Sequence, residues 1–151
     1  LDTVGNAFID TVGGVTGVVF GSLFLGAGTT AGAPGLDAGG LHRAFSAGLS
    51  AVTQRGKVTE GDKSMVDALS PAVTALRTAA EAGQPVRQAL EAAAAAADQG
   101  RDATAGMEAN VGRARSQPAR GKGHVDAGAA SVALLFQTLA ALAAEREELL
   151  R

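Results

Sequence analysis

The sequence predicts an all-α fold, an antiparallel up-and-down bundle of helices. Apolar residues make up 46% of the 151 residues but only 3% of the chain is aromatic, with no Trp or Tyr. The core material is therefore mostly Ala, Val and Leu, which suits closely packed helices. Apolar residues also recur at helical spacing, and Gly- and Pro-rich turns separate five such segments. Five helices with short connections favour an antiparallel bundle, and we expect one domain over residues 1–151.

The first two predicted helices lie in the N-terminal third of the chain. The first covers residues 7–27, and a loop containing Pro34 follows over residues 28–40. The second starts from Asp37, a good N-cap residue, and ends at the Arg55-Gly56 stop signal. Its expected core residues are Leu41, Phe45, Leu49 and Val52.

Three more helices are expected after residue 60. The third begins near Asp62 and is expected to kink at Pro71. The fourth opens with Pro85 near its first turn, and its alanine run over residues 92–97 lets a neighbouring helix approach closely. Residues 111–127 break all periodicity and predict a long loop before the last helix, which ends in a charged tail. The core residues expected in the third and last helices are Val66, Leu69, Val73, Leu76, Val132, Leu135, Leu139 and Leu142.

Composition and charge argue against several functional classes. The net charge of −2 gives no global field to recruit nucleic acid or an anionic membrane. The absence of Cys excludes disulfide scaffolds and thiolate metal sites. His42 and His124 are the only histidines, and their separation does not argue for a metal site. With no signal peptide visible, the cytoplasm is the expected location.

The uncharged segment over residues 11–36 has two alternative interpretations. Gly13, Gly17 and Gly21 repeat the small-xxx-small pattern of membrane helices that touch. A spanning helix needs about 20 predominantly apolar residues, and the apolar stretch over residues 12–27 falls just short and lacks interfacial anchors. We therefore expect a buried core helix without membrane contact, and a membrane-associated helical protein is the rival. The glycines then admit either a neighbouring helix or the phosphates of a ligand.

The glycine-rich start of this segment is the first candidate ligand site. Gly13-Gly14-Val15-Thr16-Gly17 offers backbone N–H groups without β-carbon obstruction and one hydroxyl group. If a helix begins here, these donors and the positive helix end form an anion site. No Gly-Lys-Ser/Thr follows, so this is not a Walker motif. Simple helix packing is the alternative.

Two further segments are candidates. Residues 55–67 combine glycines and alternating charges before an apolar run, with Asp62 as the expected N-cap and Met65 as either a core residue or a soft surface for a flat base. Residues 112–128 carry four cations with Asp126 as the only nearby acid. This basic loop could hold phosphates through bidentate Arg contacts, and a mobile surface loop is the alternative. The four cations are Arg113, Arg115, Arg120 and Lys122.

In this order and at these separations, the three segments resemble the nucleotide-binding L subunit of dihydroxyacetone kinases. The family strings run approximately T-V-G-G-A-S-G-x-L-[FY]-G, then R-G-K-A-x-x-G-D-K-T-M-x-D, then G-R-A…G-H-x-D-P-G-A. Here they correspond to residues 11–21, 55–67 and 112–129, and the first two are nearly intact.

The resemblance implies an antiparallel barrel of helices that holds ADP or ATP at one end through two magnesium ions. It implies that the start of the glycine-rich helix contacts the phosphates and that the second segment borders the nucleotide. The third segment would complete the cap over the nucleotide site. The matching residues are Gly14, Val15 and Thr16 for the phosphates, Gly56 and Met65 for the border, and Arg113, Asp126, Ala127 and Gly128 for the cap.

The activity implied is that of a kinase component acting on dihydroxyacetone or a related ketose. The chain would present the nucleotide, while a separate K-type subunit binds the ketone covalently. Phosphoryl transfer would then rest on positioning and on charge neutralisation by magnesium, with no catalytic residue from this chain. A phosphotransferase-system phosphocarrier and a second copy of the chain are further candidate partners. A non-catalytic regulatory or scaffold protein on the same fold is the alternative function.

The chain departs from the family pattern in two places. Ala127 stands where the family has Pro, and residues 116–122 lack the usual Ser-Tyr-Leu-Gly-Glu-Arg-Ser string. The family's magnesium ligands lie in an acidic turn before the first helix, and here Asp2 and Asp10 are the only acids before Asp37. We therefore expect no metal ligand in this chain, the magnesium ligands upstream of Leu1, and no activity without them and the partner subunit.

Overall fold

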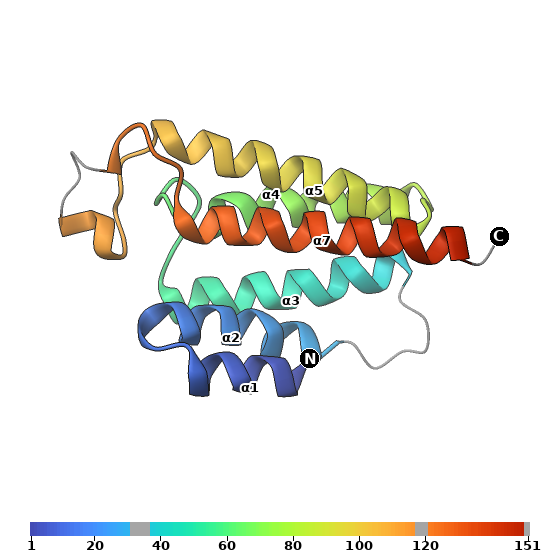
Figure 1. Cartoon of the computed structure of the whole chain (residues 1–151), viewed down its shortest axis with the longest axis horizontal. Helices are drawn as coiled ribbons and strands as arrows, with labels where there is room; N and C mark the ends of the chain where they lie inside the picture. Colours follow the sequence, from blue (N-terminus) through green and yellow to red (C-terminus); the bar gives the residue numbers. More distant parts are fainter. Residues whose placement is uncertain (31–36, 117–120, 150–151) are drawn as a thin grey trace.

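The computed structural model describes residues 1–30, 37–116 and 121–149, without the side chains of Val15, Arg113 and Ala114 (Figure 1). These residues form six α-helices and two short 3₁₀ helices, and no strand occurs among them. The prediction of an all-α bundle is confirmed. The elements are α1 (Asp2–Thr11), α2 (Gly14–Gly28), α3 (Ala38–Gly56), α4 (Val66–Glu81), α5 (Val86–Ala103), η1 (Thr104–Gly106), η2 (Arg113–Ser116) and α7 (Ala127–Leu149).

Successive helices alternate in direction along the bundle. As a result, α2, α4 and α7 begin at the same end, on the left in Figure 1, where α1, α3 and α5 finish. Each helix packs on its neighbours in the chain, and α7 packs on both α5 and α4. We call the end where α2, α4 and α7 begin the loop end. Its described parts are residues 12–13, 57–65, 104–116 and 121–126.

The core lies mainly between α4, α5 and α7. The four core residues predicted in α4 are all buried, and the small residues of α5 let its backbone approach α4 closely. A β-carbon added at Gly100 would lie 2.1 Å from the carbonyl oxygen of Asp67. In α7 the prediction was partly wrong. Leu142, which was expected in the core, is 55% exposed, whereas Phe136, which was not among the expected core residues, is fully buried.

The first predicted helix, over residues 7–27, is in fact two helices. The chain leaves the helical conformation at Val12 and Gly13, and Gly14 restarts it with φ of 75°. Two successive glycines favour such a break, because glycine adopts positive φ without the usual steric cost. Consequently α1 folds back onto α2, and the ring of Phe8 lies 5.8 Å and 5.4 Å from those of Phe20 and Phe24.

Most of the glycines in α2 serve helix packing. A β-carbon added at Gly21 would lie 2.8 Å from the carbonyl oxygen of Gly5 in α1. One added at Gly26 would lie 2.8 Å from the carbonyl oxygen of Ala47 in α3. Close helix approach therefore accounts for these glycines. The start of α2 differs, because no atom lies within 4 Å of a β-carbon added at Gly14.

The signals at the ends of α3 and before α5 were read correctly. The Oδ1 atom of Asp37 accepts a hydrogen bond from the amide of Gly40 at 2.6 Å, and α3 ends at Gly56. Pro85 directly precedes α5, and Pro71 lies inside α4. The predicted loop over residues 111–127 was too simple, because η2 interrupts it.

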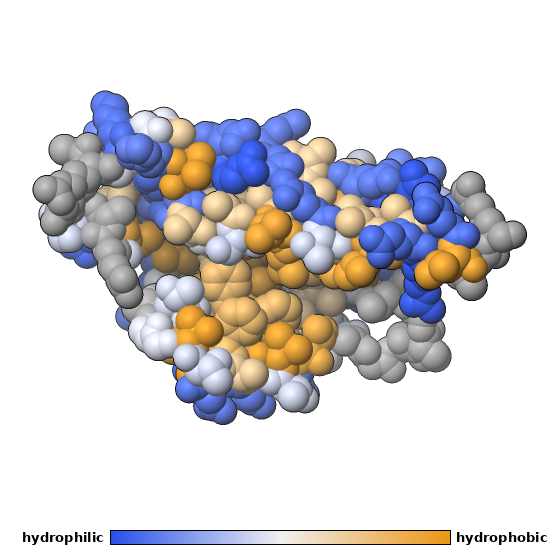
Figure 2. Space-filling model, in the orientation of Figure 1, coloured by the Kyte–Doolittle hydropathy of each residue, from blue (hydrophilic) through white to orange (hydrophobic). Residues whose placement is uncertain are grey.

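Apolar side chains gather on the face of the molecule that Figure 2 draws. They lie over the α1–α2 hairpin and along α7. By length and composition, α7 is the one helix in the described ranges that could cross a membrane, although it also contributes core residues such as Phe136. The membrane interpretation rested instead on residues 11–36, where α2 has 15 residues, fewer than the roughly 20 that a spanning helix needs.

Candidate functional site

The entry to α4 is built around the buried carboxylate of Asp67. Its Oδ1 atom accepts the amide of Gly61 at 2.5 Å, and its Oδ2 atom accepts the amide of Ser64 at 2.7 Å. The negative charge lies in the first turn of the helix, where the positive helix end stabilises it. These bonds fold residues 61–64 into a compact turn that leads directly into α4.

Asp62 was wrongly predicted as the N-cap of this helix, which begins at Val66 and not near Asp62. The reason is local geometry, because Gly61 and Lys63 both adopt positive φ and interrupt the helical path. Asp62 instead accepts the amide of Thr59 at 2.8 Å and the side-chain amide of Asn110 at 3.3 Å. Hydrogen bonding, chiefly from the Thr59 amide, lowers the pKa of Asp62.

Lys63 joins this turn to the segment that precedes α7. Its side chain is buried, with 4% of its surface exposed. The Nζ atom donates hydrogen bonds to the carbonyl oxygens of Gly121 at 2.6 Å and Met107 at 3.2 Å. Hydrogen bonds that involve a charged group contribute about 1.5–3 kcal/mol. The sequence shows Lys63 only as one charge among several in a turn, so its burial was not foreseen.

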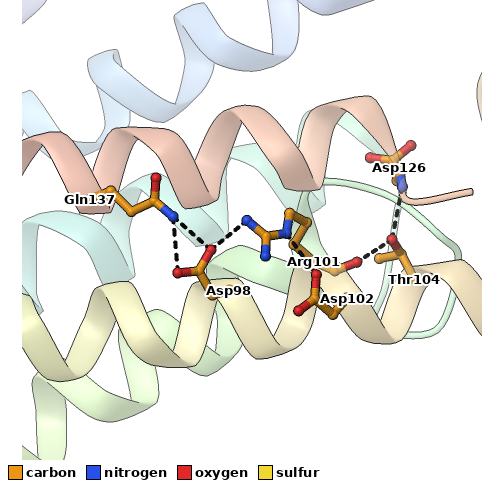
Figure 3. A network of polar contacts seen from close by, with 6 residues as sticks. All are labelled: Asp98, Arg101, Asp102, Thr104, Asp126 and Gln137. Carbon is orange, nitrogen blue, oxygen red and sulfur yellow. Dashed lines mark hydrogen bonds and ion pairs between the residues drawn. The ribbon is translucent and has the colours of Figure 1, made fainter.

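The entry to α7 is organised by Asp126 and Thr104. The Oδ2 atom of Asp126 accepts the amide of Ala129 at 2.8 Å, which is an N-cap bond. The amide of Asp126 donates to the hydroxyl of Thr104 at 2.8 Å, and this hydroxyl donates to the carbonyl of Arg101 at 2.5 Å (Figure 3). Because Thr104 is fully buried, it ties the end of α5 to the start of α7.

The carboxylates at this end influence one another. Burial raises the pKa of Asp126, and the nearby charge of Asp67 raises it further. Amide hydrogen bonds from Ala129 and Gly128 and the positive charge of Lys63 act in the opposite direction. The entries to α4 and α7 therefore form one electrostatic unit.

A polar network on the surface fixes α5 against α7. The side-chain amide of Gln137 donates to both carboxylate oxygens of Asp98, at 2.8 Å and 3.0 Å. Arg101 forms ion pairs with Asp98 at 2.6 Å and Asp102 at 2.8 Å. Figure 3 shows that this network runs along α5 toward Thr104 and Asp126. It sets the register of the two helices that lead to the loop end.

The second and third predicted segments meet at the loop end. A β-carbon added at Gly128 would lie 2.9 Å from Asp126 Oδ2 and 3.1 Å from Met65 Cβ. The predicted residues Met65, Asp126 and Gly128 are therefore brought together, with Ala127 exposed beside them. Gly56 ends α3 at the same end of the bundle, and its closest neighbour is the side chain of Val58.

The first segment reaches the same end of the bundle. Gly14 and Thr16 are exposed at the start of α2. Within the described residues, no hydrogen bond or ion pair links them to Met65 or Asp126. The side chains of Val15 and Arg113, which complete the predicted set, lie outside what the structure describes.

Among the residues that the structure describes, no group of three or more His, Cys, Asp or Glu side chains is placed to bind a metal ion. Three acids at or next to the loop end are already engaged with hydrogen-bond donors of the chain. These acids are Asp62, Asp67 and Asp126. The described residues therefore do not fit a magnesium centre.

Comparison with known proteins identifies the family. The chain matches the DAK2 domain over residues 1–141. It is 38% identical to the "PEP-dependent dihydroxyacetone kinase, ADP-binding subunit DhaL" of Escherichia coli K12, over 96% of this chain and 70% of the relative. Identity to the "PEP-dependent dihydroxyacetone kinase 1, ADP-binding subunit DhaL" of Listeria innocua is 34%, over 91% of this chain and 64% of the relative. Identity to an L-erythrulose kinase of Pectobacterium atrosepticum is 33%, over 94% and 24%.

The chain thus spans about two thirds of the two DhaL subunits and about a quarter of the erythrulose kinase. The resemblance seen in the three segments is confirmed by these matches over most of the sequence. On this evidence the chain belongs to the DAK2 domain family.

Proposed function

We propose that this chain is the ADP-binding part of a ketose kinase. It would hold ADP or ATP for phosphoryl transfer to dihydroxyacetone or a related ketose on a separate K-type subunit. The relatives support this proposal, because two are ADP-binding subunits of dihydroxyacetone kinases and a third is an L-erythrulose kinase. The observation that carries it is that all three segments with family motifs lie at one end of the bundle (Figure 1).

The geometry of the loop end suits a nucleotide. The first turns of α2, α4 and α7 lie on the same side, and the positive end of α2, which has no acidic residue in its first turn, favours phosphate groups. Phosphate oxygens can approach the backbone of Gly14 closely from the side where a β-carbon would stand, because that space is empty. The tight contact between Met65 and Gly128 provides a preformed wall for the border of the nucleotide.

Bound nucleotide supplies the phosphoryl group, and the chain's own residues bind and orient it. Because the described residues hold no group of acids placed to bind a metal ion, we propose that the magnesium ligands lie outside residues 1–151. We also propose a cytoplasmic protein that works with the K-type subunit. A phosphotransferase-system phosphocarrier and a second copy of this chain are further proposed partners.

The test of this function is ADP affinity in the full-length chain with magnesium, measured by calorimetry. Arg113→Ala should weaken binding about tenfold or more, because a hydrogen bond to a charged group contributes about 1.5–3 kcal/mol. Arg115→Ala, which removes an exposed cation from the same short helix, is the matched control and should bind normally. Equal affinity of Arg113→Ala and the unsubstituted chain would remove Arg113 from the site, and no binding by the unsubstituted chain would contradict the function.

The location of the metal ligands is tested by the same calorimetry on residues 1–151 alone. We expect this fragment to bind Mg-ADP weakly and to transfer no phosphate, because its described acids form no metal site. The full-length chain should bind tightly and only with magnesium. Tight, magnesium-dependent binding by the fragment would show that the metal ligands lie within it.

A further inference from the structure

Lys63 is a buried cation that takes no part in the proposed contacts to phosphate and magnesium. We infer that Lys63 is a positioning residue of the nucleotide site. Its ammonium group holds the segment before α7 against the entry to α4, and thereby fixes the turn of Asp126 and Gly128 beside Met65. This inference rests on the proposed function, since it assigns the residue that sets the shape of that same site.

The burial of Lys63 requires bonded partners. Only 4% of its surface is exposed, and a buried charge is costly unless it is hydrogen-bonded. Two of its three ammonium donors are used by the carbonyl oxygens of Met107 and Gly121. Among the described carboxylates, none lies within ion-pair distance of Lys63. The carbonyl groups, and at longer range the charge of Asp126, therefore stabilise the ammonium.

The backbone around Lys63 is held by hydrogen bonds from the entry to α4. Lys63 has φ of 59°, a left-handed conformation that a residue with a side chain keeps only where its surroundings enforce it. The Asp67 carboxylate binds the amides of Gly61 and Ser64, one on each side of Lys63. The turn is thus clamped to α4, and the ammonium projects from a fixed base.

The bond to Gly121 has a special place in the segment that leads to α7. That segment is also held by the amide of Gly123, which donates to Ala105 at 3.0 Å, and by the amide of Asp126, which donates to Thr104 at 2.8 Å. Both of these partners belong to η1, at the end of α5. Between residues 121 and 126 as described, Lys63 alone provides a hydrogen bond from the entry to α4. Removing its ammonium should leave this segment held only by these two bonds to η1, which then open more often, and free to shift relative to Met65.

The test uses Lys63→Met in the full-length chain, because methionine keeps a flexible apolar stem without the charge. Leu76→Ala is the matched control, because Leu76 is a fully buried core residue of α4 whose truncation lowers the melting temperature by another route. ADP affinity with magnesium is measured by calorimetry at a temperature where both variants are folded. Loss of a charge-assisted bond should weaken ADP binding about tenfold in Lys63→Met, whereas Leu76→Ala should bind normally. Lys63→Arg should recover part of the affinity.

Amide hydrogen exchange in the nucleotide-free protein gives a second readout. In Lys63→Met, the amides of Gly123 and Asp126 should exchange faster than in the unsubstituted chain, while those in the middle of α5 keep their protection. If Lys63→Met does not fold, Lys63→Gln takes its place, and we expect a smaller effect in the same direction.

Equal ADP affinity in the lysine variant and in Leu76→Ala, or unchanged exchange at Gly123 and Asp126, would overturn the positioning role. Failure of the unsubstituted chain to bind ADP would instead contradict the proposed function. In that case the exchange measurement still decides whether Lys63 holds this segment.

Discussion

At the loop end, the start of α2 and the entries to α4 and α7 differ in what surrounds their backbones. Gly14 has φ of 75° and no atom within 4 Å of an added β-carbon, and the side chain of Thr16 is exposed. At the entry to α4, by contrast, Asp67 accepts two amides and Lys63 is buried. The entry to α7 is likewise closed by internal hydrogen bonds.

This difference separates the role of binding from the role of positioning. Amides without an internal partner are available to an external anion, whereas amides satisfied by Asp67 and Asp126 are not. The start of α2 therefore presents donors to a ligand, while the entries to α4 and α7 give the site its shape. Substitutions in the closed part should change stability and affect binding only through the shape of the site, whereas substitutions in the open part should change binding directly.

The largest effect on stability is expected from Gly100→Ala in the closed part. The new β-carbon would meet the carbonyl oxygen of Asp67 at 2.1 Å, and both groups are backbone-bound and cannot turn away. Overpacking of this kind costs about 1–3 kcal/mol or more, and we expect the upper end of this range in chemical denaturation. Gly106→Ala is the control, because no atom lies within 4 Å of its β-carbon. Similar stability of the two variants would mean that α4 and α5 are not packed this closely.

The next effect concerns the buried hydroxyl of Thr104. Thr104→Val keeps the shape of the side chain but leaves the amide of Asp126 without its acceptor. An unsatisfied buried group costs about 1–3 kcal/mol, which should appear as a lower free energy of unfolding. Thr104→Ser retains the hydroxyl and should lose less. If valine and serine were equally tolerated, the hydrogen bond to Asp126 would contribute nothing to the entry of α7.

A smaller effect on stability is expected from Gly14→Ala in the open part. Alanine meets no neighbour there, but it must adopt φ near 75°, and left-handed geometry costs a residue with a side chain roughly 1–2 kcal/mol. The expected loss is about 1 kcal/mol, together with weaker ADP binding, because the β-carbon would stand beside the open backbone. Denaturation and calorimetry on the same samples measure both. Unchanged ADP binding would argue against phosphate contact at this position.

The smallest effect is a pH dependence carried by Asp126. Burial raises its pKa in the folded chain, so ionisation costs the folded state free energy that the unfolded state does not lose. The stability contributed by Asp126 is therefore full below its unfolded pKa and is lost as the pH rises through the raised folded value. Asp126→Asn keeps an oxygen acceptor for Ala129 but does not titrate.

The stability of Asp126→Asn relative to the unsubstituted chain should consequently be greatest at neutral pH. This gain in stability should decrease as the pH falls through the raised pKa of Asp126. Melting temperatures of both proteins across this range provide the measurement. The lowered pKa of Asp62 acts equally in both proteins and cancels in the difference. A difference that is constant with pH, or that grows toward acid, would contradict the burial of a charged Asp126.

The sequence alone determined the helical class, the core stripe of α4, the N-cap at Asp37 and the end of α3 at Gly56. These features depend on spacing and capping within a few residues, so a local pattern predicts them. The three candidate segments were likewise visible as strings, and they lead to the DAK2 domain family. The break between α1 and α2 also has a local cause in Gly13-Gly14. It was not predicted, because apolar residues recur at helical spacing on both sides of these glycines.

Only the tertiary structure decided how these segments support one another. Lys63 acquires its role from carbonyl groups that lie 44 and 58 residues further along the chain. Thr104 acquires its role from an amide 22 residues away, and Gly128 from its contact with Met65. No short-range pattern encodes such contacts, because they exist only after α4, α5 and α7 have packed and brought their ends together. That packing brings the second and third segments together.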